Sequence, residues 1–175
     1  MAVAMMGALT VPAFATNDVA AAGGTGTVPV ELTAEAATFS VTVPTSLAIS
    51  VDASGVVTTP TVAKIVNNSH GAVKVTGVSV AAQNGWATVD FVGADMTKEK
   101  VGAKKIALEV NNEKTTGANT ISFSAENWTK LDGKNETTSD ELAIIYKAKV
   151  PAQASPLEGT TVANVVFTIG WDAVV

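Results

Sequence analysis

The chain contains very few of the side chains from which catalytic and metal sites are built. His70 is the only histidine, and the 175 residues include no cysteine. Zinc sites of histidine and cysteine, the paired histidines of metalloprotease helices and a serine–histidine–aspartate triad on any other imidazole are therefore excluded. His70 lies in residues 67–71 (NNSHG), a run of turn-forming residues without a nucleophile motif beside it. We interpret it as a solvated turn histidine, and we expect no catalytic residues and no enzymatic activity.

Residues 132–141 (DGKNETTSDE) form the only oxygen-rich segment. Calcium takes roughly six to eight oxygen ligands, so a Ca²⁺ site is one interpretation of this segment, although its spacing is not that of an EF-hand loop. An acidic, solvated turn is the interpretation that we favour. No nucleotide cofactor is expected either, because neither GxGxxG nor GxxxxGK[ST] stands at a strand-to-helix junction.

Three tryptophans are candidates for contact with a sugar, because an exposed indole ring can stack on a pyranose. Trp171 shares a face with the apolar residues of the last strand pattern and is expected in the core, and Trp86 follows the Asn84-Gly85 turn and is expected to cap an edge. Trp128, in ENWTKLDG, is predicted to lie in a loop. We therefore single out Trp128 as the candidate glycan contact, against the commoner role of large aromatic residues in cores.

Three segments satisfy the N-glycosylation acceptor rule, beginning at Asn67, Asn127 and Asn135. Such matches arise readily by chance in a chain rich in asparagine and threonine. We interpret all three as surface loops and not as modification sites.

The composition favours one folded domain with a substantial core. Hydrophobic residues make up 47% of the chain, charged residues only 15%, and the net charge is −5. A mildly acidic chain with scattered lysines has no basic stripe for phosphates, so binding to nucleic acid or to an anionic membrane surface is disfavoured.

Alternation of period two runs through the chain from Val28 onward and predicts an all-β fold. The clearest patterns are in residues 38–51, 106–110, 142–150 and 163–171. About nine or ten short strands, turn signals between them and no long helical period predict an antiparallel β-sandwich of the immunoglobulin-like or jelly-roll-like kind.

Four local signals interrupt the alternation. Asp52 to Gly55 has the residue preferences of a type I turn, and Asn84-Gly85 between two strand patterns predicts a hairpin. The apolar parity changes at Gly77, which predicts a β-bulge. Residues 93–105 break the pattern and could hold one short helical turn closed by Gly102.

The opening of the chain resembles a secretory leader. Residues 1–10 are uncharged and mostly apolar, and Ala13 and Ala15 supply an A-x-A cleavage signal. Such a run is too short to span a bilayer, which takes roughly 20 residues. We expect a signal peptide over residues 1–15, a flexible glycine-rich linker over 16–27, a folded domain over 28–175, and an extracellular or cell-surface location.

Three segments carry a resemblance to known proteins. ATFSVTVPTSLAISVDASG, KIVNNSHGAVKVTGVSV and VANVVFTIGWD are similar to a group of secreted proteins from Gram-positive bacteria, and more distantly to WxL-type cell-surface domains and camelysin-like biofilm fibre proteins. The resemblance implies an extracellular β-sandwich that is bound to the cell wall or polymerised. Trp128-Thr129-Lys130-Leu131 has one residue too many for a WxL motif, so wall binding is not carried over. The ligand set of a metalloprotease is missing too.

The expected function is that of a secreted structural or adhesive protein of the cell surface, as a self-assembling fibre or surface-layer subunit. Its partners would be further copies of itself or other surface proteins, and an uncovered sheet edge could accept a strand from a neighbour. Residues 28–33 and the terminal strand are both candidate donors. The alternative is a carbohydrate-binding module that recognises cell-wall or host glycans.

Overall fold

The computed structural model describes residues 22, 30, 32–60, 63–134 and 139–172. The chain divides into two units, Met1–Ala36 and Ala37–Val175. In the first unit, the few described residues form no strand or helix, and the side chains of Val30 and Leu32 are 96% and 87% exposed. The predicted signal peptide and all but one residue of the predicted linker lie outside the described residues.

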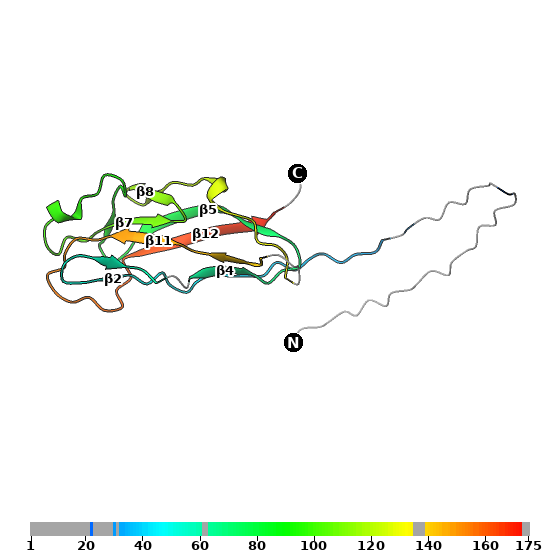
Figure 1. The fold of residues 1–175 in the computed structure, drawn as a ribbon, viewed down its shortest axis with the longest axis horizontal. Coiled ribbons are helices and arrows are strands. Elements are labelled where there is room, and N and C mark those ends of the chain that lie inside the picture. Colours follow the sequence, from blue (N-terminus) through cyan, green and yellow to red (C-terminus); the bar gives the residue numbers. More distant parts are fainter. Residues whose placement is uncertain (1–21, 23–29, 31, 61–62, 135–138, 173–175) are drawn as a thin grey trace. The chain divides into compact units, whose positions relative to one another are not determined.

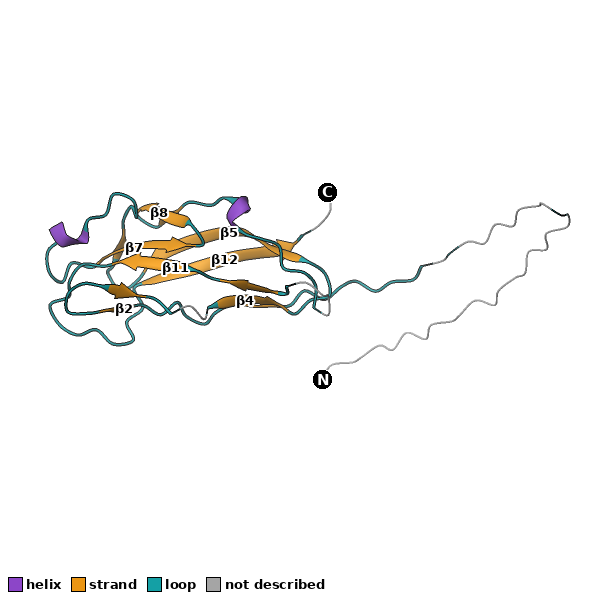
Figure 2. Ribbon diagram, in the orientation of Figure 1, coloured by secondary structure: helices purple, strands orange, loops and turns teal. Residues whose placement is uncertain are grey.

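The regular secondary structure described in the second unit is almost entirely β-strand, joined by long loops, and this confirms the predicted all-β class (Figure 2). The only helices described there are two 3₁₀ turns, η1 (Met96–Lys98) and η2 (Ala125–Asn127). The first of them falls inside residues 93–105, where one helical turn was predicted. The strands are β1 (Val41–Thr42), β2 (Ser50–Val51), β3 (Val57–Thr58), β4 (Lys64–Asn67), β5 (Val73–Ala82), β6 (Ala87–Thr88), β7 (Lys105–Val110), β8 (Glu113–Gly117), β9 (Thr120–Ile121), β10 (Glu141–Ala143), β11 (Tyr146–Lys149) and β12 (Ala163–Trp171).

These strands pair in four sheets. Their orders are β1-β4-β10, β11-β7-β8-β9 with β6 added parallel to β7, β12-β5, and β2-β3. Strands β5 and β12 are the longest, with ten and nine residues, and they run antiparallel beside each other (Figure 1). Val73 faces Trp171 at one end of this pair and Ala82 faces Ala163 at the other.

Two of the local predictions are confirmed, because each depends on a few adjacent residues. The Asp52 carboxylate accepts hydrogen bonds from the N–H groups of Ser54 (2.8 Å) and Val56 (2.9 Å), and this closes the turn between β2 and β3. The bulge predicted at Gly77 is present too, since Thr168 pairs with Gly77 and the next residue of β12 pairs with Val75.

The hairpin predicted at Asn84-Gly85 is wrong, although the turn itself exists. Both residues have positive φ, 53° and 77°, as a tight turn of this sequence requires. The strands on either side do not pair with each other, because β5 is paired with β12 and the short β6 joins β7 in parallel. The Ala87 N–H donates to the Lys104 carbonyl at 2.8 Å, which holds β6 on that different partner.

The regular pattern of residues 142–150 is divided between two sheets. Strand β10 pairs with β4, while β11 pairs with β7. At the crossing, the Asn111 side chain accepts from the Ile145 N–H (2.8 Å) and donates to the Ala143 carbonyl (3.4 Å), so an amide replaces the missing strand partner. The predicted inward parity is retained, because Ile144 and Tyr146 are only 1% and 5% exposed.

The interior consists of two groups of buried apolar residues. The larger group lies between β5, β4 and the β7–β11 pair, and it includes the indole of Trp128. The smaller group surrounds Trp86. Their members are Ile65, Val73, Val75, Val78, Val110, Trp128, Leu131, Ile144 and Tyr146 in the first, and Val80, Trp86, Ile106, Leu108, Ala148 and Val150 in the second.

Candidate functional site

Strand β12 has a sheet partner on one side only among the described strands. The far edge of its partner β5 is held at both ends: Val73 exchanges backbone hydrogen bonds with Leu131 (2.9 and 2.8 Å), and the Asn119 side chain accepts from the Ala82 N–H (2.7 Å). No comparable bond to the far edge of β12 occurs within the described part of the chain. Among the described residues, β12 therefore has a free edge nine residues long.

The direction of the backbone groups along this edge follows from the pairing. In an antiparallel ladder, the residues that bond to the partner alternate with residues that point away from it. Gln83 donates to the Val162 carbonyl at one end of β12, and Asp172 donates to the Ala72 carbonyl at the other, each at 2.9 Å. Even-numbered residues of β12 therefore direct their N–H and C=O groups to β5. The N–H and C=O groups of the odd-numbered residues point to the free edge. These residues are Ala163, Val165, Phe167, Ile169 and Trp171.

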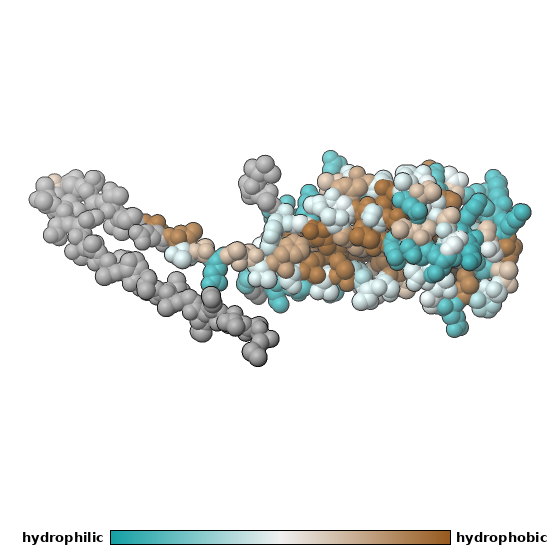
Figure 3. Space-filling view, turned by 180° about the vertical axis from the view of Figure 1, so that it is seen from behind, coloured by the Kyte–Doolittle hydropathy of each residue, from teal (hydrophilic) through white to brown (hydrophobic). Residues whose placement is uncertain are grey.

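The same odd-numbered residues carry apolar side chains that the core covers only in part. Val165, Phe167 and Ile169 pack against the larger core group and are each partly exposed. Val41, Leu47 and Ile49, from the segment before the first hairpin, are partly exposed in the same way. Figure 3 shows hydrophobic residues gathered on one face of this unit. We use the name apolar strip for a set of five residues: Val165, Phe167, Ile169 and Trp171 of β12, together with Phe39.

The β12 sequence, ANVVFTIGW, contains no charged residue and no proline. Soluble proteins commonly protect exposed edges with lysine, proline or inward-pointing charges, because a bare edge pairs readily with other chains. Strong β-formers without charge are also the signature of segments that pair with one another. The sequence of this edge therefore carries none of these protections, and its backbone groups are suited to pairing with an extended strand.

Trp171 lies at one end of the edge and is 39% exposed, so the prediction that it belongs to the core is wrong. Its alternation was read correctly, but the residues described around that end of the strand cover the ring only in part. One part of the indole rests on Gly71, where an added Cβ would lie 2.8 Å from Cζ3 of the ring. Phe39, 44% exposed, meets the indole edge-on with ring centroids 5.1 Å apart.

Trp128 lies outside the strands and helices, as the predicted loop requires, but unlike Trp171 it is buried. It is 1% exposed, its ring meets Phe167 edge-on at 5.8 Å, and its Nε1–H donates to the Glu113 carboxylate at 3.3 Å. A ring without exposed area offers no platform on which a sugar could stack. The sugar contact proposed for Trp128 thereby loses its basis.

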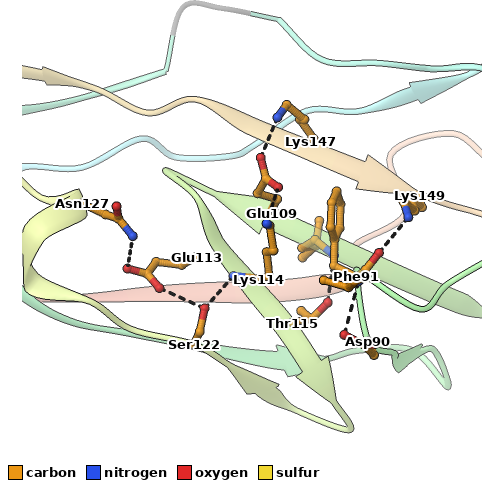
Figure 4. Close-up of polar contacts among 12 residues, drawn as sticks. Asp90, Phe91, Glu109, Glu113, Lys114, Thr115, Ser122, Asn127, Lys147 and Lys149 are labelled. Atoms are coloured by element: carbon orange, nitrogen blue, oxygen red, sulfur yellow. Dashed lines mark hydrogen bonds and ion pairs between the residues drawn. The ribbon is translucent and has the colours of Figure 1, made fainter.

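Glu113 explains how the segment around Trp128 is held in place (Figure 4). Its carboxylate is 1% exposed and accepts from the Ser124 N–H (2.6 Å), the Ser122 hydroxyl (2.9 Å) and the Asn127 amide (3.1 Å), as well as from the indole. Burial by itself raises the pKa of Glu113, but the four hydrogen bonds together outweigh it, so the pKa lies below its ordinary value. The group is a structural anchor whose acceptor positions are occupied.

Asn67 contradicts the reading of its acceptor motif as a surface loop. The side chain is fully buried and donates to the carbonyls of Gly71 (2.9 Å) and Asp132 (2.8 Å), while its oxygen accepts from the Ser69 N–H (2.9 Å). A buried amide with these partners ties the 67–71 turn to the 131–133 segment. His70, at the top of the turn, is exposed as predicted.

The segment considered for calcium is described in part. Asp132 lies 3.1 Å from the Lys130 ammonium group, and Asn135 and Glu136 lie outside the described residues. Within the described residues, no group of three or more carboxylates and histidines is placed to hold a metal ion. The calcium hypothesis therefore gains no supporting contact.

Two hollows are also present on the described surface. The larger, about 380 Å³, lies between residues 42–48 and β4, beside Tyr146. The smaller, about 240 Å³, lies over Trp86 and is bordered by Lys104 and Gln153. Neither lining, as far as it is described, contains a carboxylate or a histidine.

Sequence reasoning missed the two features on which this site depends. It considered the terminal strand as a donor, whereas β12 is built into the fold along nine residues and presents an edge that can accept. The missing charges in ANVVFTIGW were the available signal. Glu113 gave no signal, because its partners come from a separate segment, residues 122–128.

The described residues include no helix with the length and apolar character needed to cross a membrane. Comparison of the chain with protein-family models, with curated proteins and with solved structures gives no match.

Proposed function

We propose that the chain is a secreted structural or adhesive subunit of the cell surface, an antiparallel β-sandwich that associates with further copies of itself by strand addition along β12. The single observation that carries the proposal is the free edge of β12, nine residues long and without charge or proline. An extended strand placed there would bond to the backbone groups of the five odd-numbered residues and cover the apolar strip.

Strand addition is favoured over a flat side-by-side contact because the strip and the edge coincide. Main-chain hydrogen bonds supply affinity in this mode of recognition, and alternate side chains supply specificity. The odd-numbered residues of β12 offer both, since their side chains point to the core while their N–H and C=O groups point outward. Export past a leader of residues 1–15 would place such a subunit outside the cell.

A lysine within the strip tests the proposal. Val165→Lys puts a charge where the incoming strand would pack, and Val166→Lys is the matched control, because Val166 is 54% exposed on the opposite face of the same strand. We expect Val165→Lys to abolish concentration-dependent association in analytical ultracentrifugation and to remove filaments from negative-stain micrographs, while Val166→Lys leaves both in place.

Circular dichroism shows whether each variant is folded. If Val165→Lys does not fold, Ala163→Pro replaces it, since proline there removes an N–H that faces the free edge and keeps the bonds to β5. A wild-type chain that stays monomeric at high concentration contradicts the proposal, and so does a folded edge variant that associates like the wild type.

One observation favours a second function, a carbohydrate-binding module. Phe39 and Trp171 form an exposed aromatic pair, and stacking on such rings is a common way to hold a sugar. A glycan array with wild type and Trp171→Ala distinguishes the two functions. Glycan binding that Trp171→Ala removes, in a chain that remains monomeric, would favour the module.

A further inference from the structure

We infer that the strand accepted at β12 is residues 28–36 (VPVELTAEA) of a second copy, running antiparallel to β12, so that copies join head to tail in an open chain. This inference rests on the proposed function. It adds the identity of the donor segment, its direction and the reason it comes from another molecule.

The segment matches the edge in length and in pattern. Even-numbered positions are apolar throughout (Val28, Val30, Leu32, Ala34 and Ala36), and the odd-numbered positions are proline, glutamate and threonine. Both stretches are nine residues long. Val30 and Leu32 are almost fully exposed in the first unit. Packing them against a partner would therefore remove nearly all of their apolar surface from water, which favours binding.

Pro29 selects the direction of the added strand. With the even-numbered side chains turned to the strip, an antiparallel donor bonds to β12 through its even-numbered residues, since directly opposite residues bond to each other. The odd-numbered residues then face away, and Pro29 loses nothing by lacking an N–H. In a parallel donor the odd-numbered residues face β12, because each bonded residue lies opposite one that points away. Pro29 would then leave a gap in the ladder.

The antiparallel direction requires a donor from a second molecule. Aligning nine residues with nine places residue 28 opposite Trp171 and Ala36 opposite Ala163. The two ends of β12 lie about 27 Å apart, from eight steps of an antiparallel strand. Phe39 of the same chain contacts Trp171, and three residues reach at most about 11 Å, so Ala36 cannot lie beside Ala163 of its own chain.

The short distance along the chain from Ala36 to Phe39 also determines which ends of successive copies meet. Ala36 of the donor lies at the Ala163 end of the acceptor, and the donor's own domain follows directly, beginning at its Trp171 end. Unlike ends therefore meet, and a contact between unlike surfaces continues into an open chain unless its rotation closes a ring. A parallel donor would bring two Trp171 ends together, the arrangement of a closed dimer.

Proline substitution at two adjacent positions of the full chain tests the direction. Ala34→Pro removes an N–H that faces β12 in the antiparallel arrangement, and Thr33→Pro removes one that faces away; the parallel arrangement reverses these roles. Both positions precede the second unit, so neither variant should change the melting temperature of that unit in the dilute monomer. We expect Ala34→Pro to raise the concentration for half-association about tenfold, and Thr33→Pro to change it less than about twofold.

Each result decides a specific point. If only Thr33→Pro weakens self-association, the donor strand runs parallel to β12. If the two variants have equal effects, or neither has an effect, residues 28–36 do not pair with β12 as a strand of fixed direction. Each of these results overturns the inference while self-association stands. A wild-type chain that does not associate removes the proposed function instead, and the inference with it.

Discussion

The polar and apolar groups are covered and paired in the corner formed by Glu113, residues 122–127 and Trp128, whereas along the edge of β12 they are left partly open. At the corner, a buried carboxylate accepts four hydrogen bonds and the indole of Trp128 is almost fully covered. Along β12, backbone groups of alternate residues point away from the sheet and the side chains on the inward face are covered only in part. The first region holds the domain together, and the second is the edge that we propose a second copy completes.

The largest expected difference is between two tryptophans. Trp128→Ala should lower the free energy of unfolding by about 4 kcal/mol, because it leaves a large cavity and an unpaired carboxylate position. Trp171→Ala should lower it by less than about 1.5 kcal/mol, since the ring is partly exposed already. Urea titration followed by far-ultraviolet circular dichroism measures both. Equal losses would contradict the distinction between a closed corner and an open edge.

Next in size is the loss of the carboxylate itself. Glu113→Ala should cost about 3 kcal/mol, because the Ser124 N–H and the side chains of Asn127 and Trp128 are left buried without an acceptor. Glu113→Gln keeps one oxygen for these donors and should cost about half as much. The same urea titration gives the comparison. A Gln variant as unstable as the Ala variant would show that the charge, not the acceptor geometry, holds the corner.

The stability of the wild type should also depend on acidic pH through Glu113. Its pKa in the folded chain lies below the ordinary 4.5, despite burial, because the hydrogen bonds favour the charged form. Its contribution is therefore complete above about pH 4.5 and is lost as the pH falls toward the folded value. The gap in unfolding free energy between wild type and Glu113→Gln should narrow from about pH 6 to about pH 3.5. A constant gap would contradict the lowered pKa.

The smallest loss of stability is expected at the contact between Gly71 and the partly exposed ring of Trp171. Gly71→Ala places a Cβ 2.8 Å from the Trp171 ring, but the partly exposed indole can tilt away. We expect a loss of about 1 kcal/mol or less, together with a change in tryptophan fluorescence that is absent when Trp171→Ala is also present. A loss of several kcal/mol would show that Trp171 is held as firmly as Trp128.

Local features were predictable from the sequence, and features that depend on distant partners were not. The turn at Asp52, the bulge at Gly77 and the inward parity of Ile144 and Tyr146 each follow from neighbouring residues. Pairing is non-local, so alternation could not indicate that β6 joins β7 or that residues 142–150 pass between sheets.

The tryptophans show the same limit for the candidate site. Period two identifies the face to which a side chain points, but not whether anything covers that face. Trp171 has the inward parity of β12 and is exposed, while Trp128 stands in a segment without regular pattern and is buried by Phe167 and Glu113. The sequence could therefore suggest an aromatic site on this fold without identifying which tryptophan is exposed.

Hydrogen exchange of individual β12 amides tests the central claim most directly. In the dilute monomer, the even-numbered residues from Asn164 to Gly170 should be protected by β5, and the odd-numbered residues from Val165 to Ile169 should exchange rapidly. In the associated form the odd-numbered residues should become protected as well. Odd-numbered amides that are already protected in the monomer, or that stay unprotected after association, would contradict the account of β12 as an open edge that a second copy completes.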